Sequence, residues 1–213
     1  PLPVAQEAGV KYFFLGAFAA AIMLFGFSYL YGTTGSTNLH EILLKLHPGN
    51  DWTTRITLTP WQSLAVIMLI AGFAFKMAAV PLHFYAGDVY QGAATPVTAF
   101  LSFVPKASGF VALIKVLFAL GGPRWILPEP IVRSNGTGLL WILAILTMSV
   151  GNVLGLLQYN VKRVFAYSSI AHAGYVLVAV SAHSDTGSAA AMFYLAAYAF
   201  TNLGAFAVVT YFA

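Results

Sequence analysis

The sequence contains no cysteine, and only 8% of its 213 residues are charged. Without cysteine the chain can form neither a disulfide nor a thiolate-ligated iron–sulfur cluster, and thiol usage gives no information on the compartment. In soluble domains roughly a quarter of the residues are charged, so the low fraction of charged residues excludes a soluble fold. The ten lysine and arginine residues are scattered and form no basic cluster, which argues against a nucleic-acid partner.

Apolar residues make up 60% of the sequence, and the mean hydropathy is +0.82. A helix needs ~20 apolar residues to cross a bilayer. Runs of about this length cover residues 12–31, 60–80, 96–120, 138–157 and 164–182, and a further run begins near 187. The sequence therefore predicts an all-α integral membrane protein, a polytopic bundle of about six transmembrane helices with one broken helix.

The chain also lacks an initial methionine and a signal sequence, and its last residues lie within an apolar run. We therefore expect an internal fragment of a longer membrane protein. The basic residues do not fix its orientation, because Lys162 and Arg163 favour one side and Lys45, by helix count, the other.

The broken helix is predicted at residues 60–80. Thr59, Pro60 and Gln62 form a helix start with a capping box. Pro81 lacks a backbone donor and disfavours helical geometry at the preceding residue, so we expect a break within two residues of Val80–Pro81. Irregular backbone at membrane depth has to be shielded by protein or by a water-filled cavity. We therefore expect this break to be packed inside protein.

The segments around the long helices are more polar. Asn38 to Glu41 resembles a capping box and begins a predicted interfacial helix that ends before Pro48. Its histidines, His40 and His47, are interpreted as solvated loop residues and not as metal ligands. Residues 87–92 are predicted to form a loop or short re-entrant turn, and residues 121–135 a loop.

Lysines inside such helices are the main candidates for a functional site. A lysine at the centre of a membrane helix costs about 2.5 to 3.5 kcal/mol unless something compensates for it. Lys76, four residues before Val80, and Lys106, next to Pro105, are both predicted to lie in the interior. His83 follows the break, whereas Lys115 is close to a helix end and is expected to snorkel to the membrane surface.

Other polar residues offer secondary candidates. Glu7 and Lys11 are four residues apart, which suits either a surface ion pair or part of a proton relay. Ser168, His172 and Tyr175 share one helix face; packing is the favoured interpretation of the histidine, and extension of a proton path is the alternative. Ser149 and Asn152 are expected to hold helices together.

Two long segments resemble one known family. They are residues 75–110, FKMAAVPLHFYAGDVYQGAATPVTAFLSFVPKASGF, and residues 152–178, NVLGLLQYNVKRVFAYSSIAHAGYVLV. Both are similar to signatures of the antiporter-like N subunits of respiratory NADH–quinone oxidoreductase, complex I. The resemblance implies an inverted-repeat fold, with a first-repeat part at about 1–120 and a second-repeat part at about 138–213. A weak echo between residues 13–18 and 193–198 agrees with such repeats.

The resemblance also implies a function. It makes Lys76, Lys106, His83 and Lys11 a proton relay. Expected interior depth and the adjacent break, together with this match, rank Lys76 as the most sensitive to replacement, then Lys106, and Lys115 well behind. The acidic partner of Lys76 and the lysine of a second broken helix would lie outside this sequence. Electron transfer would occur in other subunits of the enzyme, which would bind NADH, FMN, iron–sulfur clusters and quinone, while this chain would hold no cofactor.

By the same resemblance, the partners would be the other membrane subunits of complex I and the lipid bilayer. The location would be the bacterial inner membrane. Two alternatives remain open at this point, a subunit of a multisubunit Na⁺ or K⁺/proton antiporter and a purely structural membrane subunit.

Overall fold

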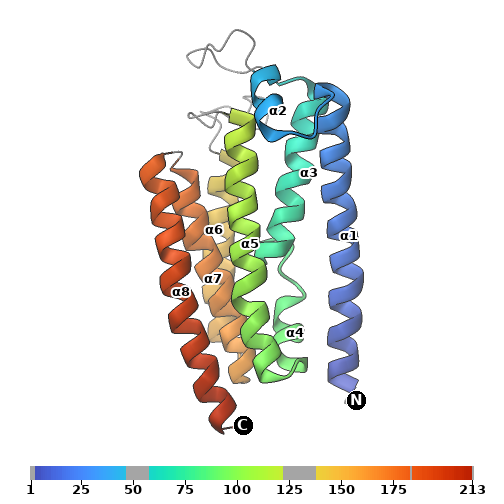
Figure 1. The fold of residues 1–213 in the computed structure, drawn as a ribbon. Coiled ribbons are helices and arrows are strands. Elements are labelled where there is room, and N and C mark those ends of the chain that lie inside the picture. Colours follow the sequence, from blue (N-terminus) through green and yellow to red (C-terminus); the bar gives the residue numbers. More distant parts are fainter. Residues whose placement is uncertain (1–2, 47–57, 122–137, 183, 213) are drawn as a thin grey trace.

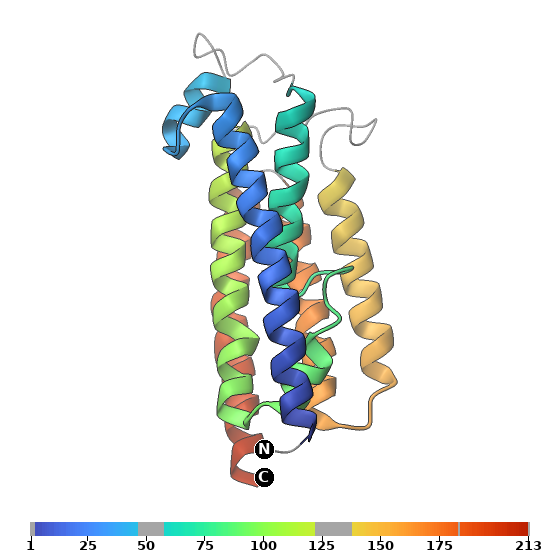
Figure 2. The same ribbon diagram turned by 90° about the vertical axis from the view of Figure 1, so that its right-hand side faces the viewer.

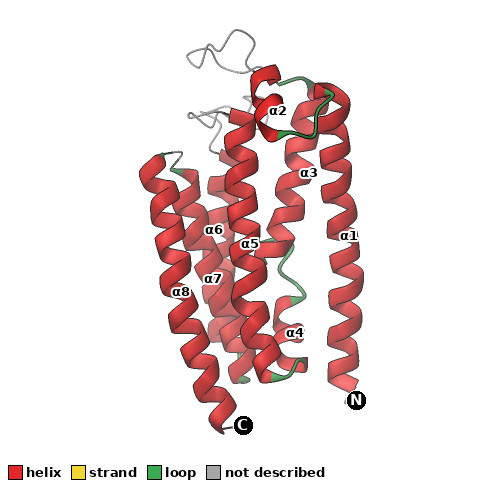
Figure 3. Ribbon diagram, in the orientation of Figure 1, coloured by secondary structure: helices red, strands yellow, loops and turns green. Residues whose placement is uncertain are grey.

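The computed structural model describes residues 3–46, 58–121, 138–182 and 184–212. All regular elements in these ranges are helices (Figure 3). They are α1 (Pro3–Thr34), α2 (Leu39–Leu46), α3 (Pro60–Met77), α4 (Ala86–Gly92), α5 (Thr95–Gly121), α6 (Gly138–Leu156), α7 (Val161–Ser181) and α8 (Asp185–Phe212).

Six of these helices, α1, α3, α5, α6, α7 and α8, are long and apolar enough to cross a membrane. They run along a common direction, with α2 lying across one end of the bundle (Figure 1). The predicted fold class is therefore confirmed, and the chain is a multi-pass integral membrane protein.

Helix α7 is the most enclosed span, and it contacts α4, α5, α6 and α8. Helices α6 and α7 form an antiparallel hairpin, with α6 at one edge of the bundle, and α1 packs against α3 and α4 (Figure 2). Helix α4 lies beyond the end of α3, so the two are halves of one interrupted column. The interruption is thus placed between α1 and the α6–α7 hairpin.

The start of α3 agrees with the sequence. The Thr59 hydroxyl accepts from the Gln62 N–H at 3.3 Å, and the Gln62 side chain accepts from the Thr59 N–H at 2.9 Å. These are the two reciprocal bonds of a capping box, which satisfy donors that the first helical turn leaves free.

The end of α3 is earlier than predicted. The helix stops at Met77, and Ala78 adopts a left-handed conformation with φ 56° and ψ 37°. The Ala78 N–H bonds to the Phe75 carbonyl and the Ala79 N–H to the Ala74 carbonyl, which is the Schellman pattern. Pro81 explains the position, because a proline ring clashes with the carbonyl four residues before it, here that of Met77.

The first part of the break is packed inside protein, as expected, whereas Pro81 and Phe84 further along are exposed. Ala78, Ala79 and Val80 are buried, and the Val80–Pro81 peptide bond is cis. The prediction of a loop at 87–92 is wrong, because these residues form most of α4. Gly92 lets α4 approach α1 closely and does not form a turn, since an added Cβ would lie 2.6 Å from the Cβ of Ala8 on α1.

Helix α1 begins at Pro3, nine residues before the predicted start at residue 12. The added residues include good helix formers, and proline is tolerated in a first helical turn. Helix α5 continues through Pro105 without a break. The predicted loop at 121–135 begins one residue too early, because Gly121 is the last residue of α5. Its other residues and His47 lie outside the described residues.

Candidate functional site

Lys106 is buried at the centre of the bundle. Lys106 is 4% exposed, and its ammonium donates hydrogen bonds to the Ser169 carbonyl at 2.8 Å and to the Ser169 hydroxyl oxygen at 2.7 Å. Among the described residues this ammonium forms no ion pair. The expectation of an interior lysine in this helix is therefore confirmed, with hydrogen bonds from α7 as its compensation.

The polar contacts of Lys106 continue into α4 and α8. The Ser169 hydroxyl oxygen lies 3.3 Å from the Tyr90 hydroxyl oxygen, so side chains of α5, α7 and α4 meet there. His172 lines the same small cavity as Lys106, and its Nδ1 is 2.6 Å from the hydroxyl oxygen of Tyr194 on α8. The space open to the centre of a water molecule is about 10 Å³, close to what one water needs.

The predicted Ser168–His172–Tyr175 stripe only partly faces this cavity. The serine that binds Lys106 is Ser169, one residue further along, because the face of α7 turned to α5 includes Ser169, His172 and Val176. Tyr175 is partly exposed and accepts instead from the Asn152 amide at 3.2 Å. That bond agrees with the packing role expected for Asn152, and Asn152 and Ser149 are both exposed.

Lys76 is not in the interior of the described chain. It is the one exposed residue between Gly72 and Val80, although residues 77–80 that follow it are buried. The sequence signalled only a charge in an apolar helix, and this signal does not tell which face of the helix carries it. His83, by contrast, is 8% exposed, and its Nδ1 has no hydrogen-bond partner among the described residues.

A second polar cluster lies at the end of the bundle where α1 begins. The Lys11 ammonium lies 2.6 Å from a carboxylate oxygen of Glu7, an ion pair that suits their spacing, and 2.5 Å from a carboxylate oxygen of Asp88 on α4. The other oxygen of Asp88 accepts from Arg163 of α7 at 2.6 Å. Two cations from two different helices thus hold one carboxylate of α4.

Asp88 lies outside the six candidate spans. Burial raises the pKa of its carboxyl, but the hydrogen bonds and charges of Lys11 and Arg163 outweigh this, so its pKa is lowered. Asp88 therefore remains ionised at neutral pH. Arg163 also bonds Gln91 and Gln158, which orients its guanidinium between α4 and the start of α7.

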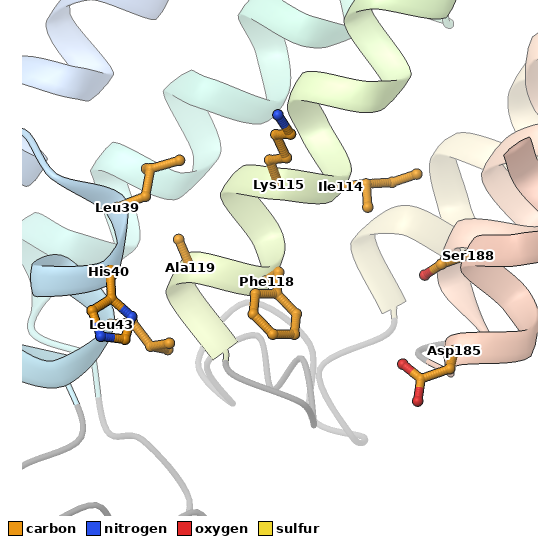
Figure 4. A pocket seen from close by; sticks show the side chains of 9 residues that line it. All are labelled: Leu39, His40, Leu43, Ile114, Lys115, Phe118, Ala119, Asp185 and Ser188. Carbon is orange, nitrogen blue, oxygen red and sulfur yellow. The ribbon is translucent and has the colours of Figure 1, made fainter.

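Lys115 lies apart from both clusters, beside a pocket of about 410 Å³ between α2, α5 and α8. It is exposed, as expected for a residue near a helix end. Its ammonium points away from the C-terminal end of α5 (Figure 4). Side chains on a helix tilt toward its N-terminus, which accounts for this direction.

Among the residues of these arrangements that sequence reasoning missed are Asp88, Thr147, Ser169 and Arg163. Thr147 is fully buried, and its hydroxyl oxygen accepts from the Val80 N–H at 3.1 Å. A threonine within an apolar helix has no distinctive pattern, so only the fold reveals this contact. Among the described residues, no group of three or more histidines or carboxylates is arranged to hold a metal ion.

These features define a class of membrane bundle, with an interrupted span next to a span that carries a buried lysine. A family model described as "NADH:quinone oxidoreductase/Mrp antiporter, TM" matches residues 2–213. The chain belongs to this family.

Relatives agree with this assignment. The chain is 43% identical over 205 residues to NADH-quinone oxidoreductase subunit N of Trichlorobacter lovleyi, covering 96% of this chain and 39% of the relative. It is 45% identical over 207 residues to subunit N 1 of Solibacter usitatus, covering 97% and 40%. The chain thus spans about two fifths of the length of these relatives.

Solved structures show the same fold. Respiratory complex I from Thermus thermophilus with bound aureothin matches with a TM-score of 0.74 and 38% identity, covering 96% of this chain and 40% of that one. The Mrp complex of a Dietzia species matches with a TM-score of 0.81 over 98% of this chain and 35% of that one. Its identity of 20% shows a shared fold alone.

Proposed function

We propose that this chain is part of a proton-translocating N subunit of NADH–quinone oxidoreductase. Electron transfer in other subunits would supply the energy, and those subunits would bind NADH, FMN, iron–sulfur clusters and quinone. The partners would be the other membrane subunits of the complex within a bacterial inner membrane. The identities of 43% and 45% to subunits of this name support the assignment.

The observation that carries the proposal is the environment of Lys106. This buried ammonium is bonded to a serine carbonyl and hydroxyl, and no carboxylate of the described residues pairs with it, so it can release its proton without breaking an ion pair there. The cavity has space for about one water beside His172, and the proton can pass through this water to the histidine. Lys106 would therefore load and release a proton as nearby charges change.

Lys76, His83 and Lys11 complete the proposed relay. Lys76 is exposed beside the break, where it can pair with a carboxylate contributed from outside this chain, as the family resemblance implies. One buried ring nitrogen of His83 has no hydrogen-bond partner among the described residues, which suits a group that accepts a proton through water. The parts at about 1–120 and 138–213 would be portions of the two inverted repeats.

Replacement of the two lysines tests this function. In the assembled complex in proteoliposomes, Lys106→Met and Lys76→Met should each lower proton pumping at least about tenfold, because a positioned proton-transfer group typically contributes about 10²- to 10⁴-fold to a rate. Lys106→Arg should not restore it, because a guanidinium stays protonated. The sequence ranked Lys76 first on assumed burial, but the burial of Lys106 now leads us to expect losses of similar size.

Lys115→Met is the matched control, since it removes a lysine from the same helix as Lys106 without touching the cavity. It should pump at nearly the wild-type rate per assembled complex. Wild-type pumping by both Lys106→Met and Lys76→Met would refute the proposed relay and would favour a purely structural subunit.

A further inference from the structure

Several hydrogen bonds at the break between α3 and α4 are made within its own segment or with the end of α3. Ala78, Ala79 and Leu82 donate to the carbonyls of Phe75, Ala74 and Ala79, and the Tyr85 hydroxyl donates to the Phe75 carbonyl at 2.8 Å. Pro81 has no N–H to donate. The Val80 N–H instead bonds to Thr147 on α6, 67 residues away in the sequence.

The Thr147 hydroxyl is oriented for this bond. It donates its own hydrogen to the Leu143 carbonyl at 2.5 Å, which leaves its oxygen lone pairs free to accept from Val80. Thr147 is fully buried, so water cannot replace it as an acceptor without a change in packing. A buried N–H left without a partner would be costly, and Thr147 removes this cost.

Thr147 sits on a closely packed hairpin. An added Cβ at Gly174 of α7 would lie 2.6 Å from the Met148 side chain and 2.7 Å from its backbone nitrogen on α6. An added Cβ at Gly151 of α6 would lie 2.6 Å from the backbone nitrogen of Ala171 on α7. Such contacts leave little room for α6 to slide along α7, so the two helices hold one relative position.

The α6–α7 hairpin also forms the polar contacts to Lys106 and to Asp88. Its α7 carries Ser169, which binds Lys106, and Arg163, which binds Asp88. The hairpin therefore contacts the break, the second half of the interrupted helix and the buried lysine together. Thr147 is the member of this set that bonds to backbone at the break.

We propose that Thr147 is a positioning residue for proton translocation. By holding Val80 it fixes the broken end of α3, and thus Lys76 four residues earlier, relative to Lys106, which the same hairpin holds through Ser169. This inference rests on the proposed function, and it assigns a role to a residue that touches neither lysine.

Two substitutions in the whole complex test the role. Thr147→Val keeps the side-chain shape but removes the acceptor, and Thr147→Ser keeps the acceptor. Thr147→Val should lower the number of protons pumped per electron at least about twofold at unchanged assembly, whereas Thr147→Ser should pump like wild type. Amide exchange of residues 78–82 should rise about tenfold in Thr147→Val only, because the Val80 N–H loses its acceptor.

The outcomes separate the possibilities. A wild-type proton-to-electron ratio in Thr147→Val, or an equal loss in Thr147→Ser, overturns the positioning role. If Thr147→Val does not assemble, Thr147→Ala takes its place, and failure of both to assemble while Thr147→Ser works shows a purely structural role. The exchange measurement does not depend on pumping, so it still reports on the contact if the lysine variants refute the proposed function.

Discussion

The ammonium of Lys106 donates hydrogen bonds to the carbonyl and the hydroxyl oxygen of Ser169 inside the bundle. Removal of one partner from a buried ion pair leaves an uncompensated charge, which is strongly destabilising. Loss of the Lys106 charge leaves no such orphan among the described residues, because its partners are neutral. Substitutions at Lys106 should therefore affect transport more than assembly, which makes this residue suitable for a functional test.

Asp88 presents the opposite situation, since it holds two cations from two helices. Asp88→Asn keeps the size of the side chain but leaves Lys11 and Arg163 with no charge opposite them on α4. We expect the thermal midpoint of the purified full-length protein at pH 7 to fall by roughly 2 to 4 °C. Glu7→Gln, which removes only the more exposed partner of Lys11, is the control and should have a smaller effect.

The effect of Asp88→Asn should also depend on pH in a defined direction. The lowered pKa of Asp88 means that its stabilisation is fully present above the pKa of the unfolded chain and is lost as the pH falls through the lower folded value. The difference between wild type and Asp88→Asn should thus be constant from pH 6 to 8 and shrink below about pH 4. A difference that varied between pH 6 and 8 would contradict the assignment.

At the scale of elements, the interruption of α3 depends on one residue with an uncommon backbone conformation. Ala78 is left-handed at φ 56°, which costs a non-glycine residue roughly 1 to 2 kcal/mol. The neighbouring Schellman bonds and burial compensate for this cost. The break is thus built by its surroundings as well as by Pro81.

Substitutions at Ala78 should follow from this conformation. Ala78→Val places a β-branched side chain at a buried left-handed position, so the amount of assembled complex on native gels should fall severalfold. Ala78→Gly removes the Cβ and should assemble like wild type, with stability changed by at most about 1 kcal/mol. Normal assembly of Ala78→Val would show that the break tolerates another geometry.

For the whole molecule, the sequence predicted the fold class and much of the site. Apolar runs located the six spans, and the Thr59–Gln62 capping box located the start of α3. Pro81 predicted the break, although α3 ends three residues earlier than Val80. These features depend on local chemistry, which can be read from neighbouring residues.

What could not be predicted depends on contacts between distant segments. Gly87 and Gly92 resembled a turn because the sequence does not show that α1 passes against Gly92. The choice between Ser168 and Ser169 is set by how α7 faces α5, and a shift of one residue rotates a side chain by about 100°. The exposure of Lys76 likewise depends on which helices cover α3.

A further prediction concerns the ion that the whole complex moves. If the chain serves a proton-translocating oxidoreductase, pumping should be unchanged when Na⁺ and K⁺ are replaced by choline. A subunit of a cation/proton antiporter would stop under these conditions. The measurement is a pH-indicator signal in proteoliposomes energised by NADH, with an uncoupler control.

The burial of Lys106 has a consequence for ion selectivity. While this lysine carries its proton, a metal cation that entered the adjacent cavity would be repelled by about 4 kcal/mol at a separation of 4 Å and an effective dielectric constant of 20. By Boltzmann weighting this is roughly a thousandfold exclusion. A proton avoids this repulsion because it binds to the neutral amine of the lysine and becomes its charge. A fixed titratable cation can therefore exclude metal ions electrostatically without a narrow pore.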